Sequence, residues 1–254
     1  LTFNSIGYPG IIFTNALPFF ENINNLAIIP RKVLMNKNVQ EKLGSNISEF
    51  ELNELFNLLN KELNFINKYD KKFGIFITIK DDKNMLRGCL GDFELSSKIE
   101  YNIAFHTLKS LFLDTRFYDN MITPEEEVKF SISFLNESIQ YYPSLKSKDL
   151  DKVKYDESSI FNHIKDIFKI GLHGITIFFT YSNGTYLSSV ITDIFKYPKG
   201  NNLTIEMFNK IVLSLRQKLN SLQQQIRKIH IFECKDIDEL MIGGKIYDIK
   251  YTNN

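Results

Sequence analysis

Three segments of the sequence alternate apolar with more polar residues, and this two-residue period limits the fold more than any other feature. Apolar side chains occupy every second position in residues 73–79, 128–134 and 175–181. Because successive side chains of a β-strand point to opposite faces of a sheet, each segment predicts a strand with one buried face. Polar turns follow the first and third segments at residues 81–84 and 182–184, so each of these two strands begins a hairpin.

Four further segments repeat apolar residues at steps of three and four, which is the spacing of one face of an α-helix. The expected helices cover residues 48–68, 96–112, 159–168 and 204–227, and a last strand is expected at 228–234. Ser48 and Glu51 stand at the start of the first helix with the spacing of a capping box. Hairpins with helices between them predict an α+β fold, in which helices flank a mainly antiparallel sheet.

The N-terminal part of the chain lacks such periods. Glycine and proline residues, among them Pro9, Pro18 and Pro30, interrupt its short apolar pieces. We therefore expect residues 1–47 to form an irregular arm that covers the body of the protein. The charged loop at residues 143–157 is the expected boundary between two lobes.

Composition places the chain among folded globular proteins. It has 254 residues, of which 43% are hydrophobic and 24% charged, with a net charge of +1. Disordered chains have fewer apolar residues and more net charge, and nucleic-acid binders usually carry a basic excess. Two cysteines, no signal peptide and no apolar run of roughly 18 residues predict an intracellular protein, cytoplasmic or nuclear, that does not enter a membrane.

The segment Leu86–Gly91, with the sequence LRGCLG, lies in the returning strand of the first hairpin. In a strand, Arg87 and Cys89 share a face with their Cα atoms roughly 6.6 Å apart, and a guanidinium near a thiol lowers the pKa of that thiol. Gly88 and Gly91 suggest that a ligand, a partner or a packed helix approaches the backbone closely. The alternative is structural: Cys89 is a small buried hydrophobe and Arg87 pairs with a carboxylate.

This segment resembles the LRGCIG signature of the AMMECR family, named for the Alport syndrome, midface hypoplasia and elliptocytosis chromosomal region. Further motifs follow in the family's order: DTRF at residues 114–117, PEE at 124–126, GLHGITI at 171–177 and Tyr186-Leu187. The similarity covers about Leu52 to Cys234. The chain departs from the family pattern at Asp92, at residues 118–120 and at Ser188, which puts surface contacts rather than the fold in question.

The resemblance implies a division into an irregular arm at 1–47, a family-like domain of two subdomains at 48–236 and a tail at 237–254. It also implies a smaller α/β lobe and a cleft between the lobes, with the LRGC segment near it. The family has no settled activity, and we expect no metal or cofactor. Relatives in prokaryotes are associated with a Memo-like protein and a radical SAM protein, so a protein partner is expected.

The matched positions hold a set of chemically active groups. Cys89 and His173 are the candidate catalytic residues, because an imidazole beside a thiol is the general logic of a thiol nucleophile. The candidate binding residues are Arg87, Gly88, Gly91, Asp114 and Arg116. The alternatives are that Asp114 and Arg116 form a structural ion pair, and that His173 caps a loop before a strand. The histidines show no metal-ligand spacing.

Three functions follow from these residues, and they leave open whether the chain is an enzyme. The first is thiol-dependent chemistry or anion binding in a cleft lined by Arg87, Cys89 and His173. The second is a non-catalytic interaction or scaffold protein in which the same residues hold the fold. The third is a nucleic-acid-associated regulatory protein, which the balanced charge disfavours.

Overall fold

The computed structural model describes residues 26–63, 74–93, 99–141 and 157–238. Within these ranges the strands form one curled antiparallel sheet in the order β2-β1-β3-β6-β4-β5. The strands are β1 (Gly74–Asp81), β2 (Leu86–Asp92), β3 (Val128–Tyr141), β4 (His173–Phe179), β5 (Asn183–Tyr186) and β6 (Ile226–Asp238). The helices are α2 (Ile29–Leu34), α3 (Lys37–Gln40), α4 (Glu49–Leu63), α5 (Ile99–Phe112), the 3-10 turn η2 (Thr115–Phe117), α6 (Glu157–Ile164), α7 (Ser188–Phe195) and α8 (Ile205–Lys218). The predicted α+β fold is confirmed.

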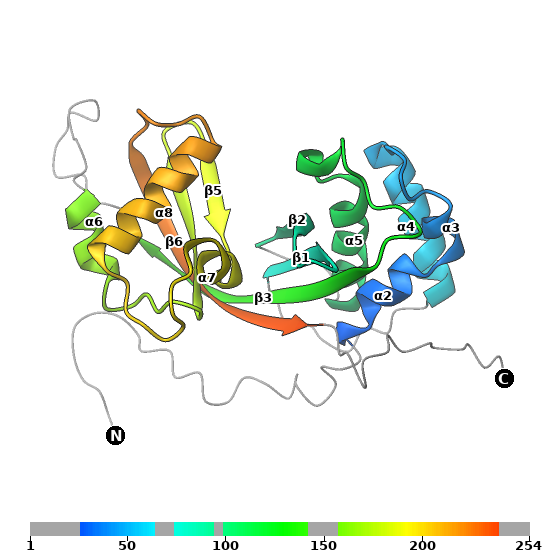
Figure 1. Ribbon diagram of the computed structural model, residues 1–254, viewed down its shortest axis with the longest axis horizontal. Coiled ribbons are helices and arrows are strands. Elements are labelled where there is room, and N and C mark those ends of the chain that lie inside the picture. The colour runs from blue at the N-terminus through cyan, green and yellow to red at the C-terminus, as the bar shows by residue number, and fades with distance from the viewer. Residues whose placement is uncertain (1–25, 64–73, 94–98, 142–156, 239–254) are drawn as a thin grey trace, which may run out of the picture.

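The sheet carries two separate hydrophobic cores, which we call the first and second lobes. In the first lobe, helices α2 to α5 pack with β1 and the start of β3, and in the second α6, α7 and α8 pack with β4 and β6. Figure 1 shows the two groups of helices at opposite ends of the long strands β3 and β6, with α7 between them. A third, smaller cluster joins the lobes, and it contains Leu135, Leu187, Phe232 and Cys234 with Cys89 packed against it.

The first helix of the prediction is present with its capping box. The backbone N–H of Ser48 donates to Glu51 Oε2 at 2.8 Å, and the backbone N–H of Glu51 donates to Ser48 Oγ at 3.2 Å. Helix α4 begins at the next residue and buries one apolar stripe. The two predicted hairpins are also present as β1–β2 and β4–β5.

In its described part, residues 26–47, the segment expected to be an irregular arm contains two helices. Helices α2 and α3 lie within residues 1–47, and Val33 and Val39 are fully buried in the first lobe. The error came from Pro30, which stands in the first turn of α2. A proline is tolerated there because the first N–H groups of a helix have no intrahelical partner.

The predicted helix over residues 204–227 is too long. Helix α8 ends at Lys218, Asn220 has a positive φ of 51°, and Ile226 begins β6. The apolar spacing continues past this end by coincidence, since Leu222 is 59% exposed. The prediction also lacked α7. Most of the expected lobe boundary at 143–157, the last residues of the predicted helix 48–68 and nearly all of the tail lie outside the described residues.

Candidate functional site

Helix α5 lies unusually close to β2, and Gly88 permits the approach. A Cβ atom on Gly88 would lie 2.3 Å from the backbone oxygen of Ser110 on α5. At this short distance the Ser110 hydroxyl bridges the backbones of β1 and β2. It accepts a hydrogen bond from the Leu90 N–H at 2.9 Å and donates one to the Ile77 carbonyl at 2.9 Å. Of the three groups expected to approach the backbone at Gly88, a ligand, a partner or a packed helix, the structure has the packed helix, α5.

Gly91 has a different neighbour. A Cβ atom there would lie 2.1 Å from the Ile75 carbonyl oxygen and 2.5 Å from both the backbone and the ring of Phe76. The missing side chain thus lets the Phe76 ring lie over β2. Neither glycine needs a ligand to explain it.

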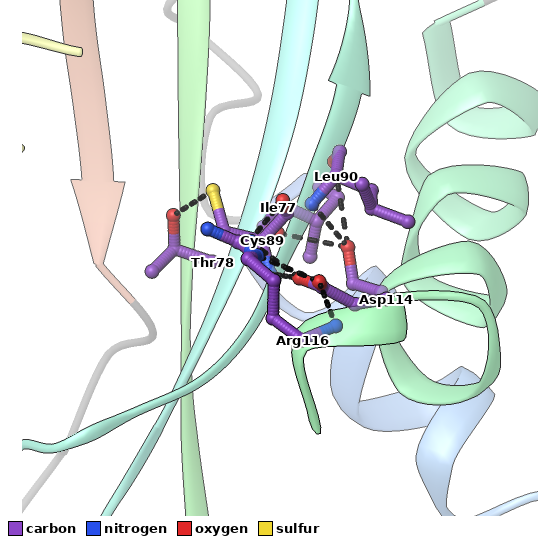
Figure 2. Close-up of polar contacts among 7 residues, drawn as sticks. Ile77, Thr78, Cys89, Leu90, Asp114 and Arg116 are labelled. Atoms are coloured by element: carbon purple, nitrogen blue, oxygen red, sulfur yellow. Dashed lines mark hydrogen bonds and ion pairs between the residues drawn. The ribbon is translucent and has the colours of Figure 1, made fainter. Parts of the chain in front are cut away.

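Asp114 and Arg116 hold the backbone of Cys89 from outside the sheet. The buried Asp114 carboxylate accepts the Cys89 N–H at 2.8 Å, and the Arg116 guanidinium donates to the Cys89 carbonyl at 3.0 Å. The two side chains also bind each other through two hydrogen bonds of 2.7 and 2.5 Å (Figure 2). Strand β2 is an edge strand, so this pair satisfies backbone groups that no neighbouring strand reaches.

This pair of side chains forms a clamp on the Cys89 backbone, whereas the Cys89 side chain contacts Thr78. Its sulfur lies 3.3 Å from Thr78 Oγ1, as Figure 2 shows, and packs against the cluster between the lobes. Burial raises the pKa of the Cys89 thiol, although the Thr78 hydroxyl and the charges of Arg116 and Lys218 act in the opposite direction. At neutral pH the thiol is therefore protonated.

The expectation that Arg87 lowers the pKa of Cys89 is wrong. The buried Arg87 guanidinium forms an ion pair with Glu126 and donates to the carbonyls of Asn120 at 3.1 Å and Met121 at 3.3 Å. Its charge therefore holds the chain segment before β3. The structure agrees with the alternative interpretation, in which Arg87 pairs with a carboxylate, here that of Glu126. The guanidinium that favours the thiolate belongs to Arg116 instead.

His173 stands at the start of β4, in the second lobe. Its Nδ1 accepts the backbone N–H of Lys169 at 2.9 Å, so the imidazole closes the turn that precedes the strand. Burial lowers the pKa of His173, and its ring lies 5.8 Å from the ring of Phe168. No hydrogen bond joins His173 to Cys89, both of which are described residues, and the interpretation of His173 as a loop cap agrees with these contacts.

Lys218 is a neighbour of Cys89 that the sequence did not reveal. It is the last residue of α8, and its ammonium lies 5.4 Å from the centre of the Tyr186 ring. Burial and the charge of Arg116 lower the pKa of Lys218, while Cys89 and Asp114 raise it. The charge of this second-lobe lysine therefore acts on the clamp of the first lobe. The sequence predicted only that Lys218 lies within a helix, at residues 204–227.

Metal-binding clusters and membrane-spanning helices were sought within the described ranges only. No group of three or more His, Cys, Asp or Glu side chains there is arranged to hold a metal ion. In the same ranges, no helix has the length and apolar character to cross a membrane.

Comparison with known proteins places the chain in a family. The AMMECR1 family model matches residues 31–233 and so begins within the expected N-terminal arm. The fold is similar to the crystal structure of uncharacterized protein PH0010 from Pyrococcus horikoshii, with a TM-score of 0.53 and 14% sequence identity over 85% of this chain and 90% of that chain. No curated protein matches the sequence. Because the family model covers most of its length, the chain belongs to the AMMECR1 family, as the motifs around Cys89 predicted.

Proposed function

We propose that this protein binds a small anionic group, a carboxylate or a phosphate, beside Cys89 where the two lobes meet. The observation that carries the proposal is that two cations from different lobes, Arg116 and Lys218, repel each other while both are attracted to the Asp114 carboxylate. Asp114 balances one of the two positive charges. The remaining charge would attract an anion, and the Arg116 side chain is 40% exposed and so open to a ligand.

The lowered pKa of Lys218 also supports anion binding. Its ammonium is partly desolvated and repelled by Arg116, both of which lower its pKa. An anion between the two cations would relieve this repulsion, and a carboxylate or phosphate would accept charge-assisted hydrogen bonds from both. Binding should therefore weaken as the pH rises through the pKa of Lys218, which lies below the usual value for lysine.

Thiol chemistry has less support than anion binding. A cysteine nucleophile needs a lowered pKa or an adjacent base. Burial raises the pKa of Cys89, and the His173 imidazole is engaged by the Lys169 backbone. In the proposed site the thiol instead packs beside the bound group, and its hydrogen bond to Thr78 fixes its position.

The test is a titration of isotope-labelled protein with sodium acetate and with sodium phosphate, at constant low ionic strength. The amide signals of Cys89 and Arg116 should shift and saturate. Arg116→Gln and Lys218→Gln should each weaken binding by about ten- to a hundredfold, because a charge-assisted hydrogen bond contributes on the order of 1.5–3 kcal/mol. Lys210→Gln, on the exposed surface of the same helix α8, is the matched control and should bind as the natural protein does. Unsaturable shifts, or an equal loss in the control, would refute the proposal.

A further inference from the structure

Among the described residues, only the strands β3 and β6 run from the first lobe into the second. On β6, Ile237 packs against the first core and Ile231 belongs to the second. On β3, Phe134 belongs to the first core, and Ile139 lies opposite Ile231. Figure 1 shows both strands passing below the two groups of helices. Any movement of one lobe against the other therefore bends these two strands.

The pairing of β3 with β6 is interrupted at the boundary between the lobes. Leu135 lies opposite Cys234 and Ser138 lies opposite Phe232, so three steps along β3 match two steps along β6. An extra residue of this kind is a β-bulge, which disrupts the ladder locally and bends its strand. The bulge follows directly after the part of β3 that packs in the first core. The ladder is therefore least regular where the lobes join.

Helix α7 belongs to the second lobe but contacts the first. Its residue Ile191 is fully buried in the second core, which anchors the helix there. Asp193, also on α7, forms an ion pair with Lys80 of β1, with 3.1 Å between Asp193 Oδ2 and Lys80 Nζ. Val190 packs against the cluster that joins the lobes, as Cys89 does from the first lobe. The pair of Lys80 and Asp193 therefore ties the second lobe to the first.

We infer that the two lobes open and close about the bulge in β3, and that the ion pair between Lys80 and Asp193 latches the closed form. Hinges are formed by a few residues that absorb the change in backbone angles. The side chains of Lys80 and Asp193 are 33% and 58% exposed, and an exposed ion pair is weak enough to break and form again. Opening uncovers the cluster between the lobes, and with it the thiols of Cys89 and Cys234.

The hinge gives the anion site a means of control, and this step rests on the proposed function. Arg116 belongs to the first lobe and Lys218 to the second. An anion bound by both side chains holds the lobes closed, because a ligand shifts an equilibrium towards the state that it binds better. Binding of the anion therefore shields the two thiols, and opening of the lobes releases the anion.

The rates at which iodoacetamide alkylates Cys89 and Cys234 in the full chain, measured by peptide mass spectrometry, test the latch. Asp193→Lys and Lys80→Asp each place like charges opposite one another, so each should speed alkylation of both thiols about three- to tenfold. These variants change the charge in opposite directions, so a rise in both does not come from a shift in a thiol pKa. The double variant restores a pair of reversed sign and should react as the natural protein does. Asp166→Lys, an exposed change of the same size in the second lobe, is the matched control and should leave both rates unchanged.

Hydrogen exchange separates a hinge from other ways of uncovering the thiols. In Asp193→Lys the amides of α5 and α7 should exchange as slowly as in the natural protein, because each helix stays packed in its own lobe. Faster exchange in α7 alone would mean that the helix leaves the second lobe, and faster exchange in both would mean general unfolding. Either result, or single variants that react at the natural rate, would overturn the hinge.

Sodium phosphate tests the control of the hinge by an anion. At ten times its dissociation constant and at constant ionic strength, it should slow alkylation of both thiols about tenfold. If phosphate binds at Arg116 and Lys218 without slowing alkylation, the anion site stands and its control by the hinge is wrong. If the latch variants react as expected but phosphate does not bind, the hinge stands and the proposed function fails.

Discussion

Substitution of Gly88 by alanine tests how β2 is held. The added Cβ would lie 2.3 Å from the Ser110 backbone oxygen and 3.2 Å from its carbonyl carbon. Both atoms belong to the backbone of α5, so no rotamer change relieves the contact and the helix must move by about 1 Å. Overpacking of this kind costs about 1–3 kcal/mol.

The movement has a second cost. It draws the Ser110 hydroxyl away from Leu90 and Ile77, whose backbone groups lie in the ladder between β1 and β2. Each of the two lost hydrogen bonds adds roughly 1 kcal/mol, so we expect Gly88→Ala to lower the free energy of unfolding by about 3–5 kcal/mol. For a chain of this size that corresponds to a fall of about 6–20 °C in Tm.

Urea denaturation followed by far-UV circular dichroism measures the loss. Gly184→Ala is the matched control, because its Cβ would meet the ends of two flexible side chains, Leu215 and Leu219, each at 2.9 Å. These can rotate, so the control should lose about 1 kcal/mol. Ser110→Ala removes the hydroxyl without crowding and should fall between the two. A Gly88→Ala variant as stable as the Gly184→Ala variant would refute the argument.

Further predictions concern the groups around Cys89. Asp114→Asn should cost about 2–3 kcal/mol in urea denaturation, because an amide has one acceptor oxygen in place of two and no charge, so it cannot keep both hydrogen bonds of the Arg116 guanidinium and the bond from Cys89; a loss below about 0.5 kcal/mol would contradict the clamp. Alkylation of Cys89 should be slow at neutral pH and should still accelerate above about pH 9, since burial raises the pKa of its thiol; a plateau near neutrality would contradict this. The hydrogen bond from Arg87 holds the pKa of Glu126 below its usual value, so the pair stabilises the fold above the usual carboxyl pKa and the gain is lost as the pH falls through the lowered pKa. Glu126→Gln should flatten that part of the profile of unfolding free energy against pH, and an unchanged profile would show that the pair contributes nothing.

The strands were predictable because their signal is local. Alternation in β1, β3 and β4 records which face is buried, and the structure buries Ile75, Ile77 and Ile79 completely. The end of α8 was not predictable in the same way. An apolar residue at Ile226 fits a helical stripe and the first position of a buried strand equally well, and only the left-handed backbone of Asn220 separates them.

The site was only partly predictable. Strand alternation indicates on which face of the sheet a side chain lies, but not which distant residues that side chain contacts. Arg87 extends from β2 to a carboxylate and to carbonyls more than thirty positions further along the chain, and no local pattern records such contacts. Lys218 lies near Cys89 only because the long strands β3 and β6 bring the second lobe beside the first. By contrast, Asp114 and Arg116 are two positions apart, so their pairing was foreseeable.

A crystal of the protein soaked in sodium bromide would test the anion site most directly, because bromide is an anion that anomalous diffraction locates without ambiguity. We predict an anomalous peak between the Arg116 guanidinium and the Lys218 ammonium, beside Cys89, which disappears in the Lys218→Gln variant and persists in the Lys210→Gln variant. Bromide bound at other surface cations, with no peak between these two residues, would contradict the proposal that the junction of the lobes is an anion-binding site.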